Sequence, residues 1–201
     1  VAAVNAALAS GAKTYEADYG VQLLSHSPME PMNAPAHLTK DRCEIWVSTQ
    51  VPGDMRDAMV KTFGLPKDAV TVHLTQVGGG FGRRLETDYG VLAAKASRAL
   101  GGVPVKLIWT REEDMTHDVY RPASLCRLRA ALNGDRTIRA LDYTGATAND
   151  RALGGIGWNY PYGDVVLRQK NTKLQFPVGS WSSVDPGITI FFIESFMDEI
   201  A

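Results

Sequence analysis

The sequence has only two cysteines, Cys43 and Cys126, and they lie far apart. A disulfide framework, a zinc site or a cysteine-ligated iron–sulfur cluster is therefore not indicated. No apolar run approaches the roughly 20 residues needed to cross a bilayer, and no signal-peptide pattern follows Val1. The 201 residues carry 21 basic and 22 acidic side chains, so the net charge is −1. This balance argues against nucleic acid or an anionic membrane as a partner.

The composition is that of an ordinary globular protein, with 45% hydrophobic and 21% charged residues. We therefore expect a soluble domain, in the cytoplasm or periplasm if the protein is bacterial. Because the sequence starts at Val1 rather than at Met, we expect a piece of a longer chain or a processed product.

The first half of the sequence alternates between strand and helix periodicity. Asp54 is a plausible N-cap of one helix, and Gly64 is its expected end. The patterns predict a helix or linker over 1–11, strands over 15–23, 43–50, 69–77 and 104–110, and helices over 52–64 and 91–102. This order predicts an α+β fold, in which a mixed sheet and its helices form a ββαβαβ unit over 1–118.

The second half, 119–201, is predicted to be rich in strands. Two long alternating runs over 124–148 flank Asn133-Gly134-Asp135, a sequence typical of a hairpin turn. A loop is predicted over 149–163, a strand over 165–176 and a helix at the end of the chain, although 188–193 also fits a strand. We treat 119–201 as a second part that continues the same binding region.

The stretch QVGGGFGRR, residues 76–84, lies between a predicted strand and a predicted helix. Backbone N–H groups at such a turn and at a helix N-terminus favour an anion or an oxo group. A third dinucleotide-binding glycine is absent because position 83 is arginine, and no Gly-Lys-Ser/Thr follows, so neither nucleotide-binding pattern fits. A bulge that only allows close packing of strand and helix is the alternative.

A second notable stretch, HSPMEPMNAPAH, contains His26, Met29, Glu30, Met32 and His37 between prolines. It predicts a loop whose side chains do not all belong to a core. Three interpretations remain open: a proline-rich connector, a copper site built from histidine and methionine, or the rim of a cofactor pocket.

These two stretches, together with STQVPGDMRDAMVKTFGLP, VKLIWTREEDM and PVGSW, resemble the molybdenum-binding large subunit of the xanthine oxidase family of molybdenum hydroxylases. The resemblance is strongest to the isoquinoline oxidoreductase and aldehyde oxidase branch and extends from about Tyr15 to Ala201. It implies a molybdopterin cofactor with molybdenum, in a cytosine dinucleotide form. It also implies oxidation of aldehydes or N-heteroaromatic compounds.

The resemblance assigns roles only to matching positions. Gln50 corresponds to a glutamine whose amide meets an oxo ligand of the metal. Gly80, Phe81 and Gly82 correspond to a segment whose backbone N–H groups face the oxo group and the pterin, so a side chain at Gly79 or Gly80 would obstruct this approach. The arginines Arg83 and Arg84 either meet a cofactor phosphate or are two solvated cations at a helix start.

The sequence also departs from the family. Ser182 follows PVGSW where an arginine is usual, and Leu85 takes the place of a glutamate found in xanthine-type members. The family's catalytic glutamate lies in a Gly-x-Gly-Glu stretch that this chain lacks, and Glu194 and Glu199 do not match it. We therefore assign no catalytic residue here.

Two hypotheses follow for the function. The chain is either one wall of the cofactor site, inactive alone, or a non-catalytic binding or assembly module derived from the family. The first implies the rest of the large subunit, a small iron–sulfur subunit and a flavin or cytochrome electron acceptor as partners. Surfaces that would meet the rest of the subunit are expected to be apolar, which predicts a homodimer of the isolated chain.

Overall fold

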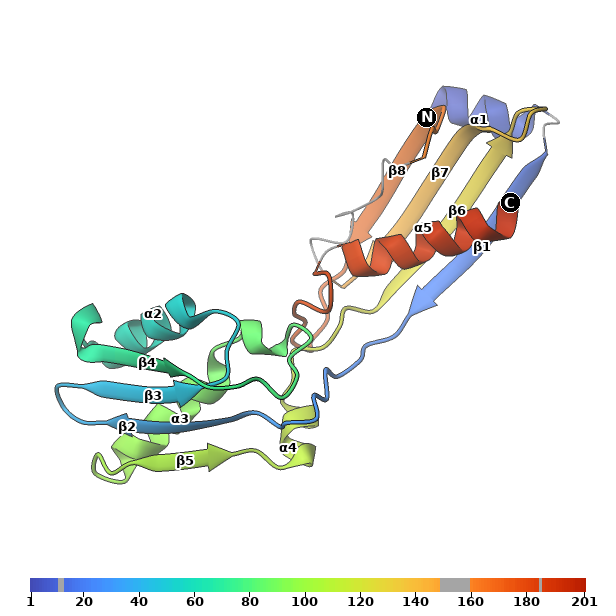
Figure 1. The fold of residues 1–201 in the computed structure, drawn as a ribbon. Helices are drawn as coiled ribbons and strands as arrows, with labels where there is room; N and C mark the ends of the chain where they lie inside the picture. The colour runs from blue at the N-terminus through green and yellow to red at the C-terminus, as the bar shows by residue number, and fades with distance from the viewer. Residues whose placement is uncertain (11–12, 149–159, 185) are drawn as a thin grey trace. The chain divides into compact units, whose positions relative to one another are not determined.

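The computed structural model describes residues 1–10, 13–148, 160–184 and 186–201. The chain divides into two compact units (Figure 1). Unit 1 contains residues 1–24 and 120–201, and unit 2 contains residues 25–119. No helix in the described ranges is both long and apolar enough to cross a membrane.

Unit 2 is built on a four-stranded mixed sheet in the order β4-β3-β2-β5. The strand β2 is antiparallel to both β3 and β5, whereas β3 and β4 are parallel. The elements in chain order are β2 (Asn33–Leu38), β3 (Cys43–Val47), α2 (Pro52–Phe63), β4 (Val70–Leu74), α3 (Asp88–Ala99), β5 (Val105–Ile108) and the short α4 (Arg111–Thr116). Two 3-10 turns, η1 (Lys67–Ala69) and η2 (Arg83–Leu85), flank β4.

The core of unit 2 lies between its sheet and the helices α2 and α3. Alternate residues of β2 and β3 are buried, so each strand contributes one face to the core. They pack with helix residues whose apolar positions recur at helical spacing. Fully buried members include Met32, Ala34, Ile45, Val47, Met55, Met59, Tyr89 and Ala93.

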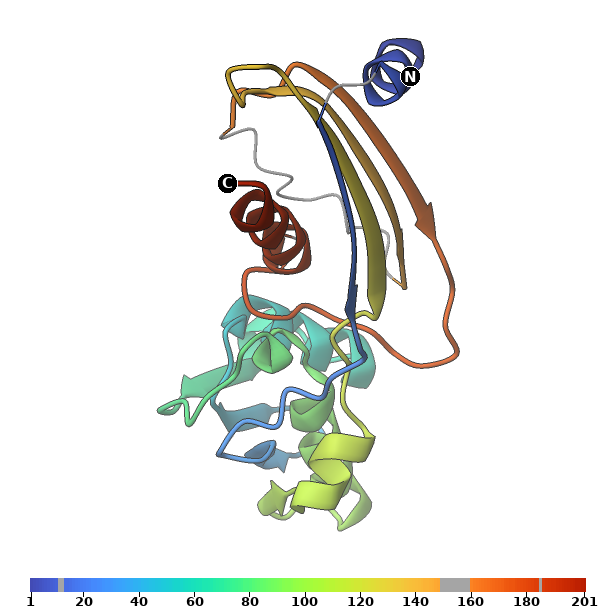
Figure 2. The ribbon, with the colours of Figure 1, turned by 90° about the vertical axis from the view of Figure 1, so that its right-hand side faces the viewer.

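Unit 1 is a second mixed sheet in the order β1-β6-β7-β8. Its strands are β1 (Thr14–Val21), β6 (Ser124–Leu132), β7 (Ile138–Thr147) and β8 (Asp164–Asn171), and its helices are α1 (Ala2–Ala9) and α5 (Pro186–Ile200). The helices α5 and α1 cover opposite faces of this sheet (Figure 2). Leu128, Leu141 and Tyr143 face Phe192 and Phe196 of α5, and Val4 and Ala7 of α1 pack against Ala131, Ala140 and Val166.

The α+β class and most predicted elements are confirmed. The hairpin of β6 and β7 turns at residues 133–137, where the Asn133 N–H donates to the Thr137 carbonyl over 2.9 Å. The C-terminal segment is a helix rather than a strand. Helix α2 begins at Pro52, with Val51 and not Asp54 in the N-cap position. Of the loop predicted over 149–163, residues 149–159 lie outside the described residues.

The division of the chain differs from the expected one. The ββαβαβ unit exists, but its first strand is β2, because β1 pairs along its whole length with β6 of unit 1. The prediction of a loop over 26–37 was wrong for β2. Pro35 made a central strand look improbable, yet the β3 ladder covers only Ala36–Leu38 and leaves the proline outside.

A buried carboxylate links three strands of unit 1. Asp142 on β7 is 1% exposed and accepts hydrogen bonds from Arg129 on β6 and Arg168 on β8. Burial opposes ionisation of Asp142, but these two hydrogen bonds outweigh it and hold the pKa of its carboxyl below the ordinary value. The charge therefore stabilises the pairing of β6, β7 and β8.

This pair of contacts predicts a pH dependence. The pKa of Asp142 is lowered on folding, so its ionised carboxylate adds to the free energy of unfolding. This contribution is complete above the unfolded-state pKa of about 4. It is lost as the pH falls through the folded-state pKa. We expect Asp142→Asn to cost about 1.5–3 kcal/mol at pH 7 and to flatten the loss of stability below pH 4. Urea unfolding at pH 7 and pH 3 measures both. An unchanged acid slope in the variant would contradict this assignment.

Candidate functional site

The glycine turn, residues 78–82, connects β4 to η2 in unit 2. Its backbone is unusual because Gly79, Phe81 and Gly82 have φ angles of 100°, 55° and 113°. Such values are rare for a residue with a side chain, and Phe81 adopts one while remaining 54% exposed. A strained, exposed aromatic residue between buried glycines is typical of a functional constraint.

The helix predicted over 91–102 is present, but it does not start at the glycines. The 3-10 turn η2 follows Gly82, and α3 starts only at Asp88. The N-terminus of α3 is therefore not part of the glycine turn, and no observation supports a contribution of its N–H groups to an anion site there. The donors that remain are those of the turn itself.

The neighbours of the turn explain why it contains glycines. A Cβ at Gly78 would stand 2.5 Å from the Glu30 Cβ, which no side chain tolerates. A Cβ at Gly80 would stand 3.2 Å from the Gln50 Oε1 and 3.5 Å from two Arg84 carbons. The alternative of close packing is thus partly correct, because the turn is closely packed within unit 2. The same geometry also brings Gln50 to Gly80.

Several polar groups at this point have no partner in the described part of the chain. Gly80 and Gly82 are buried, and the N–H groups of Gly80, Phe81 and Gly82 donate to no acceptor among the described residues. The Gln50 carboxamide also makes no hydrogen bond within those residues, although it lies beside Gly80. Buried N–H groups are normally paired. The N–H groups of the buried Gly80 and Gly82, with the N–H of the exposed Phe81 and the carboxamide of the exposed Gln50, consequently form a cradle suited to an external acceptor such as an oxo group.

The Arg84 side chain connects the backbone segments around this cradle. Its side chain is 0% exposed. Its Nε donates to the Gly79 carbonyl over 2.6 Å, Nη1 to the carbonyl and hydroxyl of Ser48, and Nη2 to the carbonyl and carboxylate of Glu30 over 3.2 and 2.8 Å. A guanidinium group has five N–H donors, so every one of them has an acceptor inside unit 2.

Arg83 is equally buried. Its two Nη atoms donate to the Asp88 carboxylate over 2.8 and 2.7 Å, and its Nε lies 3.2 Å from the Asp118 Oδ1. The guanidinium carbon lies 5.8 Å from the Tyr89 ring centre and 5.5 Å from that of Trp109. Burial opposes the charge, but the aspartates prevail and raise the pKa of Arg83.

The interpretation of the two arginines as solvated cations was therefore wrong. Both have side chains that are fully buried, and the donors of Arg84 are all occupied within the unit. In this arrangement the arginines position backbone rather than present charge to solvent. A contact with a cofactor phosphate stays a prediction that no observation supports.

Glu30 has a structural place beside the turn. Its carboxylate accepts from the Gly78 N–H over 2.7 Å, from Arg84 and from the Asn33 amide over 2.9 Å. Burial opposes its ionisation, but these donors lower the pKa of Glu30 below the ordinary value. These contacts bind the Glu30 carboxylate to the backbone of the turn and to Arg84.

The copper interpretation of the same stretch is not supported by the geometry. Met32 is buried in the core of unit 2, Met29 is 91% exposed, and the His26 ring contacts Asp118 at 3.0 Å. These side chains do not converge. Across the described ranges, no group of three or more His, Cys, Asp or Glu residues is arranged to hold a metal ion.

Asp118 and Asp88 are neighbours of Arg83 that the sequence analysis did not identify. Asp118 is 1% exposed and accepts hydrogen bonds from the Ser25 hydroxyl and the His26 N–H over 2.7 and 2.5 Å. It thereby ties both ends of unit 2 to Arg83. Residues 83 and 118 are distant in sequence, so no local pattern signals this contact.

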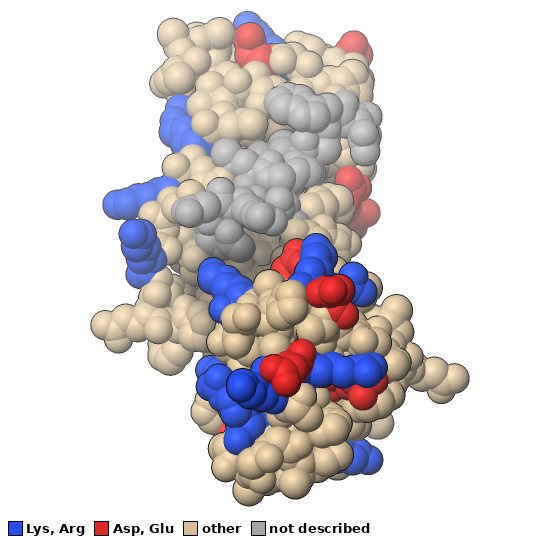
Figure 3. All heavy atoms as spheres, turned by 90° about the vertical axis from the view of Figure 1, so that its left-hand side faces the viewer, with Lys and Arg blue, Asp and Glu red and all other residues tan. Residues whose placement is uncertain are grey.

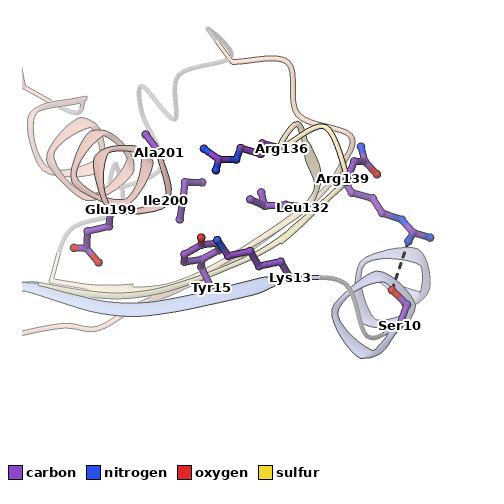
Figure 4. A pocket seen from close by; sticks show the side chains of 11 residues that line it. Ser10, Lys13, Tyr15, Leu132, Arg136, Arg139, Glu199, Ile200 and Ala201 are labelled. Atoms are coloured by element: carbon purple, nitrogen blue, oxygen red, sulfur yellow. Dashed lines mark hydrogen bonds between the residues drawn. The ribbon is translucent and has the colours of Figure 1, made fainter.

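Unit 1 contains pockets of its own that include none of the predicted site residues. One of about 760 Å³ is lined by Lys13, Tyr15, Arg136, Arg139 and Glu199, among others (Figure 4). Another of about 400 Å³ contains Ser182 beside Trp181, with the Arg121 guanidinium 5.7 Å from the Trp181 ring centre. On the face shown in Figure 3, basic and acidic side chains are interspersed, as expected from the balanced charge.

Comparison with known proteins identifies the family. The model of the molybdopterin cofactor-binding domain matches residues 2–153, which is most of the chain. The chain belongs to this family. The resemblance to molybdenum-binding subunits of the xanthine oxidase family is thereby confirmed, and the glycine turn and Gln50 lie inside the matched segment.

Relatives of this molybdopterin-binding domain are much longer proteins. The present chain is 33% identical, over 98% of its length, to a protein from Gluconacetobacter polyoxogenes named membrane-bound aldehyde dehydrogenase [pyrroloquinoline-quinone]. It spans 29% of that relative. It is 43% identical over 61% of its length to isoquinoline 1-oxidoreductase subunit beta of Brevundimonas diminuta, and spans 16% of that protein.

The fold is also found among solved structures. The quinoline 2-oxidoreductase from Pseudomonas putida 86 matches 97% of the domain with a TM-score of 0.76 at 23% identity, and the domain covers 27% of that chain. The aldehyde oxidoreductase from Desulfovibrio desulfuricans matches 94% with a TM-score of 0.78 at 20% identity, over 22% of that chain. These likenesses show a shared fold.

Proposed function

We propose that the chain forms one wall of the molybdenum cofactor site of a hydroxylase that oxidises aldehydes or N-heteroaromatic compounds. The observation that carries the proposal is the set of unpaired N–H groups at Gly80, Phe81 and Gly82 beside the unpaired Gln50 carboxamide. The family match and the names of the relatives support it. On this proposal the cofactor follows the family model and is not pyrroloquinoline quinone.

The residues present fit such a cofactor. The three N–H groups would donate hydrogen bonds to acceptor atoms of the cofactor, and the Gln50 amide would donate a further one. The bound cofactor, in a cytosine dinucleotide form, supplies the two-electron chemistry of hydroxylation. The chain's own contribution is to orient that group with fixed donors, which requires no rearrangement of the turn when the cofactor arrives.

On this proposal, residues and chains other than those described here carry out the other parts of the reaction. The proposal assigns the catalytic base to a glutamate elsewhere in a longer large subunit, and electron transfer to a small iron–sulfur subunit and then to flavin or a cytochrome. A positioned acid–base group contributes about 10²–10⁴-fold to rate. The chain alone is therefore expected to be inactive.

Amide-resolved NMR of the isotope-labelled chain tests this function. Isolated molybdopterin cofactor, added without oxygen, is expected to shift the amide signals of Gly80, Phe81 and Gly82 and the side-chain amide of Gln50. The method detects binding in the millimolar range, so a single wall of the site suffices. Signals that move only at Lys13, Arg136 and Arg139, or that do not move at all, would contradict the proposal.

Self-association of the isolated chain is a separate prediction. Large apolar side chains are exposed in both units, including Leu74 at 61%, Leu125 at 68% and Phe176 at 60%. Where such side chains form a contiguous patch, the patch marks a contact with other protein. We expect a homodimer in light scattering at high concentration, and a strictly monomeric species would contradict it.

A further inference from the structure

The glycine turn is held from one side by Glu30. The Gly78 N–H donates to the Glu30 Oε2 over 2.7 Å, and the Glu30 N–H donates back to the Gly78 carbonyl over 3.1 Å. Asn33 donates to the other carboxylate oxygen over 2.9 Å and fixes the rotation of the carboxylate. One residue thus binds both the N–H and the carbonyl of Gly78.

Arg84 holds the turn from the other side. It contacts the Gly79 carbonyl at 2.6 Å and the Glu30 Oε2 at 2.8 Å, while its own carbonyl accepts from the Gln50 N–H over 3.0 Å. The Thr49 hydroxyl donates to the same carbonyl over 3.1 Å. Arg84 therefore holds both the turn and the backbone of Gln50, whose carboxamide lies beside Gly80.

The turn has little else to fix its conformation. Within residues 78–82 the remaining backbone hydrogen bonds are accepted by the Gly80 carbonyl from the Arg83 N–H over 2.8 Å and by the Gly82 carbonyl from the Leu85 N–H over 3.1 Å. Glycine loses more conformational freedom on ordering than any other residue. A turn with four glycines held only by its own backbone would sample many conformations, and cofactor binding would then have to supply the cost of ordering.

We propose that Glu30 and Arg84 are positioning residues that hold residues 78–82 in the cofactor-receiving conformation before any cofactor binds. The inference rests on the proposed function in so far as it concerns the cofactor. The contacts of Glu30 and Arg84 with residues 78–82, which we call the clamp, are present in the chain without cofactor. Lysine is not expected to replace Arg84, because its donors all lie on one nitrogen, whereas Arg84 contacts Gly79, Ser48 and Glu30 through three different nitrogens.

Hydrogen exchange at single amides in the cofactor-free chain tests the clamp. The informative amides are those of Glu30, Gln50, Gly78 and Arg83, whose acceptors belong to the clamp or the turn. In Glu30→Gln the acceptor charge is lost with little change in shape. We expect these four amides to exchange about tenfold to a hundredfold faster, whereas the amides of α3 keep their rates.

Arg84→Lys is expected to have the same local effect. Arg42→Lys and Glu113→Gln are the matched controls, since Arg42 and Glu113 are 62% and 61% exposed, and neither should change exchange at the four amides. If Arg84→Lys accelerates exchange throughout unit 2, Glu30→Gln decides the question. Unchanged exchange at the four amides in Glu30→Gln would overturn the inference.

Cofactor titration of the same variants separates the two proposals. If the wild-type chain shows the clamp in hydrogen exchange but no shifts with cofactor, the clamp stands and the proposed function fails. If cofactor binds the wild type and Glu30→Gln with equal affinity, the clamp does not prepare the turn for the ligand, and the inference is overturned while the function stands.

Discussion

Replacing Gly80 with alanine is expected to weaken cofactor binding by at least about tenfold, equivalent to roughly 1.4 kcal/mol, while the fold is retained. The new methyl group would stand 3.2 Å from the Gln50 Oε1 and 3.5 Å from the Arg84 side chain. The flexible Gln50 side chain is the group that gives way, which removes its amide from the site. The backbone itself accepts alanine, because Gly80 is not among the glycines with positive φ.

The affinity of Gly80→Ala is measured by titrating amide signals with isolated cofactor. Gly134→Ala is the matched control, since a Cβ at Gly134 in the hairpin turn meets nothing within 4 Å. Both variants should unfold at nearly the same urea concentration as the wild type. Equal cofactor affinity of the wild type and Gly80→Ala would refute the role of Gln50 and Gly80 in the site.

Replacing Arg83 with leucine is expected to destabilise unit 2 by about 3–5 kcal/mol, the range found when one partner of a buried ion pair is removed. The substitution leaves Asp118, which is 1% exposed, without its contact to the guanidinium. It also removes the bidentate hydrogen bonds to Asp88 and the stacking against Trp109.

The loss is measured by urea unfolding followed through the amide signals of α3, which report on unit 2 alone. Arg42→Leu makes the same change at a side chain that is 62% exposed, where an ion pair contributes about 0–1 kcal/mol. A difference of less than about 1 kcal/mol between the two variants would show that the buried network around Arg83 does not support the fold.

The sequence predicted the elements well where one periodicity dominated. The alternation of Val70, Val72 and Leu74 and the Asn133-Gly134 turn each specify a local structure that short-range contacts can satisfy. It failed at β2, because Pro35 suggested a loop and the sheet neighbours that accept a proline there are distant in sequence. The sequence predicted β1 as a strand but placed it in the wrong sheet, because an alternating pattern identifies a strand but not its partner.

The same limit applies to the site. The glycines and Gln50 were found through motifs, and the structure brings Gln50 to Gly80. The burial of Arg83 and Arg84 was missed, since adjacent arginines in a polar stretch are usually exposed. Among their acceptors, Glu30, Ser48 and Asp118 are distant in sequence and only the fold brings them to the arginines, whereas Asp88 lies five residues after Arg83.

The most direct test is a crystal structure of the cofactor-bound protein, grown without oxygen from the longest chain that contains these residues. The account predicts that the N–H groups of Gly80, Phe81 and Gly82 lie within about 2.7–3.2 Å of oxygen or nitrogen atoms of the cofactor, with the Gln50 amide at an oxo ligand. Glu30 and Arg84 should keep the contacts described above. A cofactor bound elsewhere, with the turn facing solvent, would contradict the account.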